Sequence, residues 1–331
     1  MNATAKKTFS GVGLVYTILS VCVTAVQLAI SAAGLIFTDK VKFLDDVNVQ
    51  IIINSLILYV IGFCILKGGL DKQNLSCTRL EKHSMSVGEV LKAFCMCYAV
   101  LIASNIIGNM ITTSIGVLKG SPIINPIEEL ITQMNIPVMI LFAVICAPIF
   151  EELFFRKFLI DRVVKYGELP AALLSGFMFG LFHGNLSQFP YAFTIGIFFG
   201  ILYIRTGRIL YPVILHAMIN FFGSAVSVIV IRSFSVDLLN NLSVADLSVS
   251  ELFTPENMIG LAVLLLFELV VFILVIVGSI LWIFNWKKIC FYTREMDIPR
   301  NERMKTVLAN PGMIAYMIFW AAMIVYSIFT K

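Results

Sequence analysis

Nine apolar stretches of this 331-residue chain constrain its fold more than any other feature. A helix needs ~20 apolar residues to cross a bilayer, and only helices and closed barrels satisfy their backbone polar groups there. The stretches are residues 10–37, 49–66, 88–115, 137–155, 170–186, 189–204, 209–231, 257–285 and 311–330. The fifth and sixth are short enough to be partly re-entrant. With 59% hydrophobic and 13% charged residues, the sequence predicts an all-α, polytopic transmembrane helical bundle of about eight to nine spans.

The basic residues predict the orientation of the bundle. If the N-terminus is cytoplasmic, 19 of the 24 Lys and Arg residues fall in cytoplasmic segments. Cytoplasmic loops of membrane proteins carry such an excess. We therefore expect a multi-pass integral protein of the plasma membrane with its N-terminus inside. The net charge of +4 follows from this topology, and no segment resembles a nucleic-acid-binding patch.

Three of the apolar stretches contain residues that are costly in hydrocarbon: EELFFR (151–156), FGLFHG (179–184) and HAMIN (216–220). A charged side chain at the bilayer centre costs about 2.5–3.5 kcal/mol on insertion scales. Such residues persist where they pair around water, a metal or a substrate. The sequence therefore predicts one buried polar site, whose candidate residues are Glu151, Glu152, Arg156, His183, His216 and Asn220.

Helical spacing predicts different roles for the two glutamates. Residues four apart share a helix face, so Glu152 pairs with Arg156, and His216 lies on the face of Asn220. Glu151 points about 100° away from Glu152. We expect Glu152 and Arg156 to form a structural ion pair, and Glu151 to be the reactive group.

The spacing of the turns predicts that the motifs meet. If the helix that carries the glutamates runs on to Tyr166 and turns at Gly167–Pro170, the next helix returns antiparallel and brings residue 183 opposite Glu152. Glycines four residues apart predict close helix contact there. They are Gly176, Gly180 and Gly184 on one helix and Gly196 and Gly200 on the next. Pro148 is expected to kink the helix and to open room for water.

These residue types suit hydrolysis. A buried carboxylate such as Glu151, beside His183 and Arg156, can hold and deprotonate a water as a general base. His216 and Asn220 can donate hydrogen bonds to a developing oxyanion. Two histidines and a carboxylate, Glu151, His183 and His216, would also suit zinc, although the chain has no HExxH motif. The cofactor is therefore either zinc or none.

The order EExxxR, FxxxH and HxxxN in successive spans resembles the CAAX protease and bacteriocin-processing family, which includes the Ras-converting-type CAAX prenyl endopeptidases. The resemblance implies an all-helical intramembrane protease core whose site opens to the cytoplasmic half of the bilayer. It implies that Glu151 and His183 activate the water, that His216 and Asn220 form the oxyanion site, and that Glu152 and Arg156 orient the first motif. Three parts follow: N-terminal helices (1–135), the protease core (136–226) and C-terminal helices with a basic inner loop (227–331).

The predicted function is a membrane-embedded endopeptidase, of glutamate type or metalloprotease type, that cleaves a membrane-associated peptide or protein. A CAAX-like substrate and a bacteriocin-type substrate both stay open. The alternative is a non-catalytic immunity or partner-binding protein on the same scaffold. A transporter that relays protons through Glu268 and the histidines is a third hypothesis, against which the absence of a visible inverted repeat counts.

Other polar residues in the spans have weaker interpretations. Asn105, Asn109 and Thr112 form a stripe that either lines the cavity or makes interhelical hydrogen bonds. Glu268, inside LLLFELVVF, has no evident partner in the sequence. We expect the seven cysteines to be reduced packing residues, and residues 126–134 to form a short surface helix.

Overall fold

The computed structural model describes residues 2–36, 42–123, 125, 132–235, 238 and 253–330, and these contain helices and no strand. Within them, eight helices are long and apolar enough to cross a membrane. A ninth apolar helix, α9 (Glu168–Phe182), has 15 residues and is shorter. The predicted all-α polytopic bundle is confirmed. The orientation of its termini stays a prediction.

The remaining helices follow the predicted spans closely. They are α1 (Asn2–Ile36), α2 (Val47–Leu56), α3 (Gly62–Lys72), α4 (Val87–Lys119), α6 (Ile136–Met139), α7 (Ala147–Glu152), α8 (Leu159–Val163), α10 (Phe189–Thr206), α11 (Leu210–Asn220), α12 (Ser227–Arg232), α15 (Pro255–Asn285), α16 (Arg303–Val307) and α17 (Pro311–Phe329). Four π-helical stretches join some of them into continuous spans: Ile57–Ile61, Ile140–Cys146, Leu153–Phe158 and Phe221–Val226. The predicted surface helix at 126–134 lies mostly outside the described residues.

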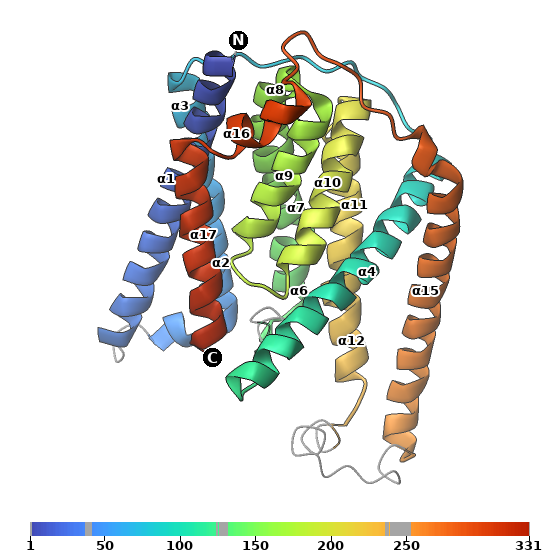
Figure 1. The fold of residues 1–331 in the computed structure, drawn as a ribbon. Helices are drawn as coiled ribbons and strands as arrows, with labels where there is room; N and C mark the ends of the chain where they lie inside the picture. The colour runs from blue at the N-terminus through green and yellow to red at the C-terminus, as the bar shows by residue number, and fades with distance from the viewer. Residues whose placement is uncertain are drawn as a thin grey trace.

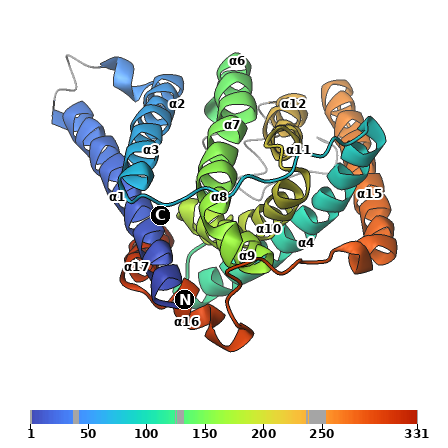
Figure 2. The same cartoon turned by 90° about the horizontal axis from the view of Figure 1, so that it is seen from above.

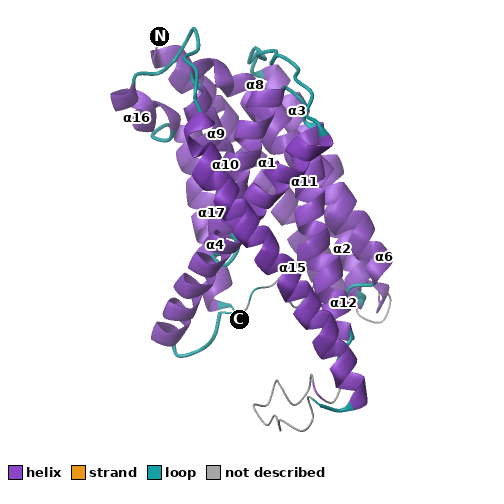
Figure 3. Cartoon of the chain, turned by 90° about the vertical axis from the view of Figure 1, so that its right-hand side faces the viewer, coloured by secondary structure: helices purple, strands orange, loops and turns teal. Residues whose placement is uncertain are grey.

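The helices that carry the motifs lie at the centre of the bundle. Figures 1 and 2 show α7–α11 between a group of α1, α2, α3 and α17 on one side and the pair α4 and α15 on the other. Helix α4 crosses the central helices obliquely, and α15 packs against α4 at the edge (Figures 1 and 3). The polar motifs are therefore surrounded by helices on both sides.

Glycines bring α9 and α10 into close contact, as their spacing predicts. A Cβ on Gly176 would lie 2.7 Å from the carbonyl oxygen of Phe193, and one on Gly196 would lie 2.8 Å from the Cα of Gly176. Gly184 differs from the expected pattern because it lies beyond the end of α9. It has a left-handed φ of 65° and faces Trp320 of α17.

The span that carries the glutamates runs from Ile136 to Tyr166 and then turns at Gly167, whose φ is 127°. This is the expected hairpin, with α9 as its returning arm. Two π-helical stretches lie on either side of the glutamates. Such stretches shift the hydrogen-bond register of a helix and often lie at functional sites. Carbonyls in the second stretch bond to other helices: Tyr16 of α1 donates to Phe154 O at 2.6 Å.

Two loops, residues 73–86 and residues 289–298, close the end of the bundle where α9 begins, at the top of Figure 1. The second loop, residues 289–298, is tied down by the fully buried carboxylate of Glu168. This carboxylate lies 2.7 Å from Nη2 of Arg205 and 2.6 Å from Nη2 of Arg294, and it accepts a hydrogen bond from the backbone N–H of Tyr292 at 2.9 Å. A buried acid thus fastens the C-terminal loop to the central helices.

Candidate active site

Glu152 lies at the centre of a buried polar cluster. Its carboxylate is 3.0 Å from Nε of Arg156, one helical turn away, and both side chains are 0% exposed. Its other oxygen accepts a hydrogen bond from Nδ1 of His216 at 2.9 Å. A carboxylate can only accept, so His216 carries a proton on Nδ1. Glu152 therefore joins the first motif to the third and fixes the orientation of the imidazole.

Arg156 is held from several sides. Its Nη2 donates to the carbonyl oxygen of Gly196 on α10 at 3.3 Å. The guanidinium carbon lies 4.6 Å from the ring centre of Phe179 and 5.4 Å from that of Phe199. Aromatic faces attract cations, more strongly where water is excluded. The aromatic rings thus supplement the ion pair, while Nη1 has no hydrogen-bond partner among the described residues.

Glu151 is the more accessible of the two carboxylates. Its side chain is 17% exposed, against 0% for Glu152, and its Oε2 lies 3.7 Å from Nε2 of His216. The two glutamates therefore face opposite nitrogens of one imidazole. The expected division between an ion-paired Glu152 and a separate Glu151 is what the geometry shows, while their catalytic roles stay proposals.

His183 lies at the C-terminal end of α9. Its Nδ1 is 2.8 Å from the carbonyl oxygen of Phe179, one turn earlier. The Phe179 ring lies 4.8 Å from the His183 ring and 5.8 Å from that of His216, so both imidazoles pack on one phenylalanine. His183 interacts electrostatically with Glu151, but within the described residues no hydrogen bond or ion pair joins it to either glutamate.

Asn220 satisfies a carbonyl that the helix itself leaves open. Its amide nitrogen donates to Ala143 O at 2.8 Å. In this π-helical stretch the N–H of Ala147 bonds to Phe142 O, five residues back. The next pair in that register would be residue 148 and Ala143, but Pro148 has no N–H. One hydrogen of the Asn220 amide is therefore used in this bond, and the other is available.

The three predicted metal ligands supply suitable donor atoms without forming a metal site. In the described part of the chain, no group of three or more His, Cys, Asp or Glu side chains is placed to hold a metal ion. Nδ1 of His216 and Nδ1 of His183 bond to Glu152 and to Phe179 O. These bonds leave Nε2 of each ring free and are also typical of zinc-bound histidines. It is the placement of Glu151, His183 and His216, and not these bonds, that does not fit a zinc ion, and no step below is derived through one.

The sequence interpretation missed several partners of the motif residues. The rings of Phe179 and Phe199 and the carbonyls of Ala143 and Gly196 all bind site residues. Only Phe179 had a signal, as the first residue of FxxxH. A phenylalanine in an apolar span otherwise resembles any packing residue, and backbone carbonyls leave no trace in a sequence.

The polar stripe of α4 bonds within its own helix. Asn109 donates to Asn105 at 2.9 Å, and Thr112 donates to Gly108 O at 3.0 Å. The link between helices comes from Ser104, which lies 2.8 Å from the hydroxyl of Thr194 on α10. The expected hydrogen bond between helices is therefore made by Ser104 and not by Asn105, Asn109 or Thr112.

Glu268 lies apart from the cluster. It is exposed on α15, and its contact is an electrostatic interaction with Tyr98 of α4. Among the described residues it makes no hydrogen bond or ion pair that would connect it to either motif histidine. The hypothesis of a proton relay for transport gains no support from this placement.

Comparison with known proteins finds similarity over the region that carries the three motifs. Residues 133–222 match the family model described as "Type II CAAX prenyl endopeptidase Rce1-like". Over 143 residues the chain is 30% identical to "Putative membrane peptidase YdiL" of Bacillus subtilis. This aligned region covers 43% of this chain and 57% of that protein. Over 202 residues it is 25% identical to "Membrane-embedded CAAX protease MroQ" of Staphylococcus aureus. This second aligned region covers 57% of this chain and 80% of that protein. No solved structure matches significantly. The resemblance predicted from the three motifs is confirmed.

Proposed function

We propose that this chain is a membrane-embedded endopeptidase that hydrolyses a peptide bond of a membrane-associated substrate. The observation that carries the proposal is the placement of His216 between two carboxylates, with Glu152 2.9 Å from Nδ1 and Glu151 3.7 Å from Nε2. A structural ion pair needs neither the second glutamate nor the histidine. A buried imidazole oriented by one carboxylate and facing another is typical of proton-transfer chemistry.

In the proposed reaction, Glu151 is the general base. It takes a proton from a water that also bonds to Nε2 of His183, since Nδ1 of that ring is held by Phe179 O. The water oxygen forms a bond to the scissile carbonyl carbon, and the C=O π electrons move onto oxygen. The tetrahedral intermediate then collapses, the C–N bond breaks, and Glu151 returns the proton to the leaving amine.

The developing oxyanion is stabilised by His216 and Asn220 in this mechanism. His216 donates from Nε2 when both ring nitrogens carry a proton, with its Nδ1–H bonded to the carboxylate of Glu152. Asn220 contributes the amide hydrogen that Ala143 O does not use. Removing one such donor typically costs about 10²–10³ in rate.

The substrate class follows from where the site lies and from the relatives. The cluster is surrounded by membrane-spanning helices, so the scissile bond must be presented by a peptide that itself partitions into the membrane. The family model and one of the relatives are named as CAAX endopeptidase and CAAX protease. We propose a CAAX-like or bacteriocin-type peptide on that similarity.

The decisive test is cleavage of candidate membrane peptides by the purified protein in lipid vesicles, followed by mass spectrometry of the products. Glu151→Gln removes the proposed base, and Glu268→Gln makes the same chemical change on the exposed face of α15. We expect product ions with the wild type and with Glu268→Gln, and none with Glu151→Gln. Equal cleavage by all three proteins would refute the mechanism.

A second test addresses the metal. Because the geometry supports a metal-free site, cleavage should persist in protein that has been treated with a chelator and carries less than about 0.1 equivalent of zinc; a three-ligand catalytic site would bind about one. Loss of activity on chelation, with recovery on addition of zinc, would show instead that Glu151, His183 and His216 rearrange around a metal.

A further inference from the structure

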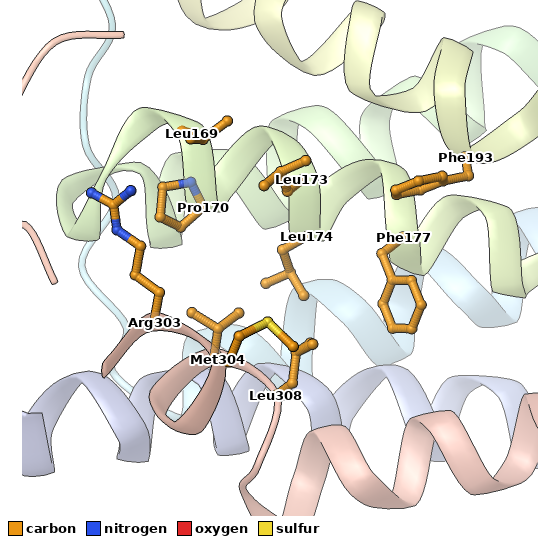
Figure 4. A pocket seen from close by; sticks show the side chains of 10 residues that line it. Leu169, Pro170, Leu173, Leu174, Phe177, Phe193, Arg303, Met304 and Leu308 are labelled. Atoms are coloured by element: carbon orange, nitrogen blue, oxygen red, sulfur yellow. The ribbon is translucent and has the colours of Figure 1, made fainter. Parts of the chain in front are cut away.

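An apolar pocket opens between α9, α10 and α16, at the end of the bundle where α9 begins (Figure 4). Its volume is about 230 Å³. Its lining includes Leu173 and Phe177 of α9, Phe193 of α10, and Arg303 and Met304 of α16. Arg303 is the one charged residue that lines it, and it lies at the opposite end of the pocket from Phe177 and Phe193 (Figure 4).

The pocket is separate from the candidate active site. Leu173 and Phe177 are four residues apart and so share a face of α9. Phe179, which contacts Arg156 and both motif histidines, comes two residues after Phe177 and therefore lies about 200° around the helix. The two sites therefore use opposite faces of one helix.

The pocket opens to the surroundings of the bundle. Leu173 is 42% exposed and Met304 is 71% exposed. Both lie where the pocket opens outward, and Arg303 is the one lining side chain that offers a polar partner to a water, which needs two to four. A lipid chain is therefore the natural occupant of the space between α9 and α16.

Arg303 supplies the polar end. It is held in place by a hydrogen bond from Nε to Ile298 O at 2.9 Å and by Asp297, 3.4 Å from Nη2. Among the described residues Nη1 makes no hydrogen bond or ion pair, and the side chain is 24% exposed. Arg303 is thus the basic group at the mouth of the pocket, and Asp297 contacts only its Nη2. A guanidinium in this setting suits a phosphate.

We propose that this pocket binds one anionic phospholipid, with an acyl chain along Leu173, Phe177 and Phe193 and the phosphate on Arg303. The inference is independent of the proposed protease function. Apolar contact alone gives no selectivity in a bilayer, because lipid chains are as apolar as leucine. Selectivity for an anionic headgroup must therefore come from Arg303.

The test measures phospholipid retained by the purified protein, by native mass spectrometry in detergent with equal phosphatidylglycerol and phosphatidylcholine added. Leu173→Trp fills the pocket, and Leu269→Trp on lipid-exposed α15 is the matched control. Arg303→Gln removes the headgroup contact, and Arg300→Gln, which removes a neighbouring exposed charge that does not line the pocket, is its control.

We expect about one phosphatidylglycerol on the wild type and both controls, none on Leu173→Trp, and about fivefold weaker retention on Arg303→Gln, since a basic residue near the surface contributes about 1 kcal/mol toward anionic lipid. Equal retention of the two lipids by the wild type would overturn the proposal. So would retention that is unchanged by Leu173→Trp.

All variants must elute as the same monodisperse peak, and Leu173→Phe replaces the tryptophan variant if that one fails to fold.

Discussion

Two adjacent glutamates in this chain occupy different environments because a helix turns by about 100° between them. Glu152 faces inward, toward Arg156 and Nδ1 of His216, and is fully buried. Glu151 faces the other nitrogen of the same ring and is 17% exposed. One carboxylate is thus held in a buried ion pair, and the other is the proposed general base.

This difference predicts opposite effects for the same substitution. Glu152→Ala leaves Arg156 buried without its counter-ion, and breaking a buried ion pair in this way costs about 3–5 kcal/mol. We expect a markedly lower unfolding temperature in detergent for Glu152→Ala. For Glu151→Ala we expect a nearly unchanged unfolding temperature with loss of cleavage. If both variants unfolded at the wild-type temperature, the Glu152–Arg156 pair would not be the structural unit described here.

Among the elements, the span from Ile136 to Tyr166 contains a π-helical stretch, Ile140–Cys146, that provides a hydrogen-bond acceptor for the third motif. Pro148 cannot donate to Ala143 O in the π-helical register, and Asn220 of α11 donates instead. The third motif is thereby fixed against the helix that carries the first. In a regular α-helix the N–H of Ala147 would bond to Ala143 O, and Pro148 would instead leave Val144 O without a donor.

The same contact predicts a partial rescue. Asn220→Ala removes the donor to Ala143 O, and a buried carbonyl left unpaired costs about 1–3 kcal/mol. Adding Pro148→Ala supplies a backbone N–H in its place. We expect the double variant to regain most of the unfolding temperature lost in Asn220→Ala, but not its cleavage rate if Asn220 also contacts the oxyanion. Additive losses of stability would argue against the exchange of donors.

Helix α15 is the least enclosed span, with 6% of its most apolar stretch buried, and it carries Glu268 on its exposed face. An acid at the centre of a span is costly, by about 2.5–3.5 kcal/mol on insertion scales. We therefore expect Glu268→Leu to be at least as well expressed in the membrane as the wild type, and to keep full cleavage activity. A loss of activity specific to this variant would show that Glu268 contacts the substrate.

At the scale of the whole molecule, the end of the bundle where α9 begins is fastened by buried charge as well as by apolar packing. Glu168 holds Arg205 at the end of α10 and Arg294 in the loop that leads to α16. Tyr316 of α17 adds a hydrogen bond to Met178 O of α9 at 2.8 Å. The C-terminal helices are therefore tied to the same helix that carries His183.

Glu168→Gln tests this connection. It leaves both arginines without their counter-ion, so we expect the unfolding free energy to fall by roughly 2–4 kcal/mol, somewhat less than for a fully buried pair because the arginines are partly exposed. Limited proteolysis should cut the loop at 289–298 faster in this variant. The exposed Glu295→Gln, in the same loop, is the control and should behave like the wild type.

The sequence by itself determined the membrane-spanning helical architecture, because hydrocarbon admits few backbone conformations and each apolar run must become a helix. It also indicated that the motif residues gather, since charges and imidazoles cost less in hydrocarbon when they are paired; Glu268, exposed on α15, is the exception. The i,i+4 spacing separated Glu152 from Glu151, and the Gly167 turn brought α9 back beside the glutamates. These inferences rest on local geometry, which a sequence records directly.

Only the tertiary structure decided which nitrogen of His216 each glutamate faces, and that Asn220 binds a backbone carbonyl. It also showed the rings around Arg156, the hold of Glu168 on the C-terminal loop, and the pocket between α9 and α16. Each of these depends on contacts between residues far apart in the chain. Such contacts are fixed by the rotation and depth of whole helices, and no periodicity in the sequence encodes those.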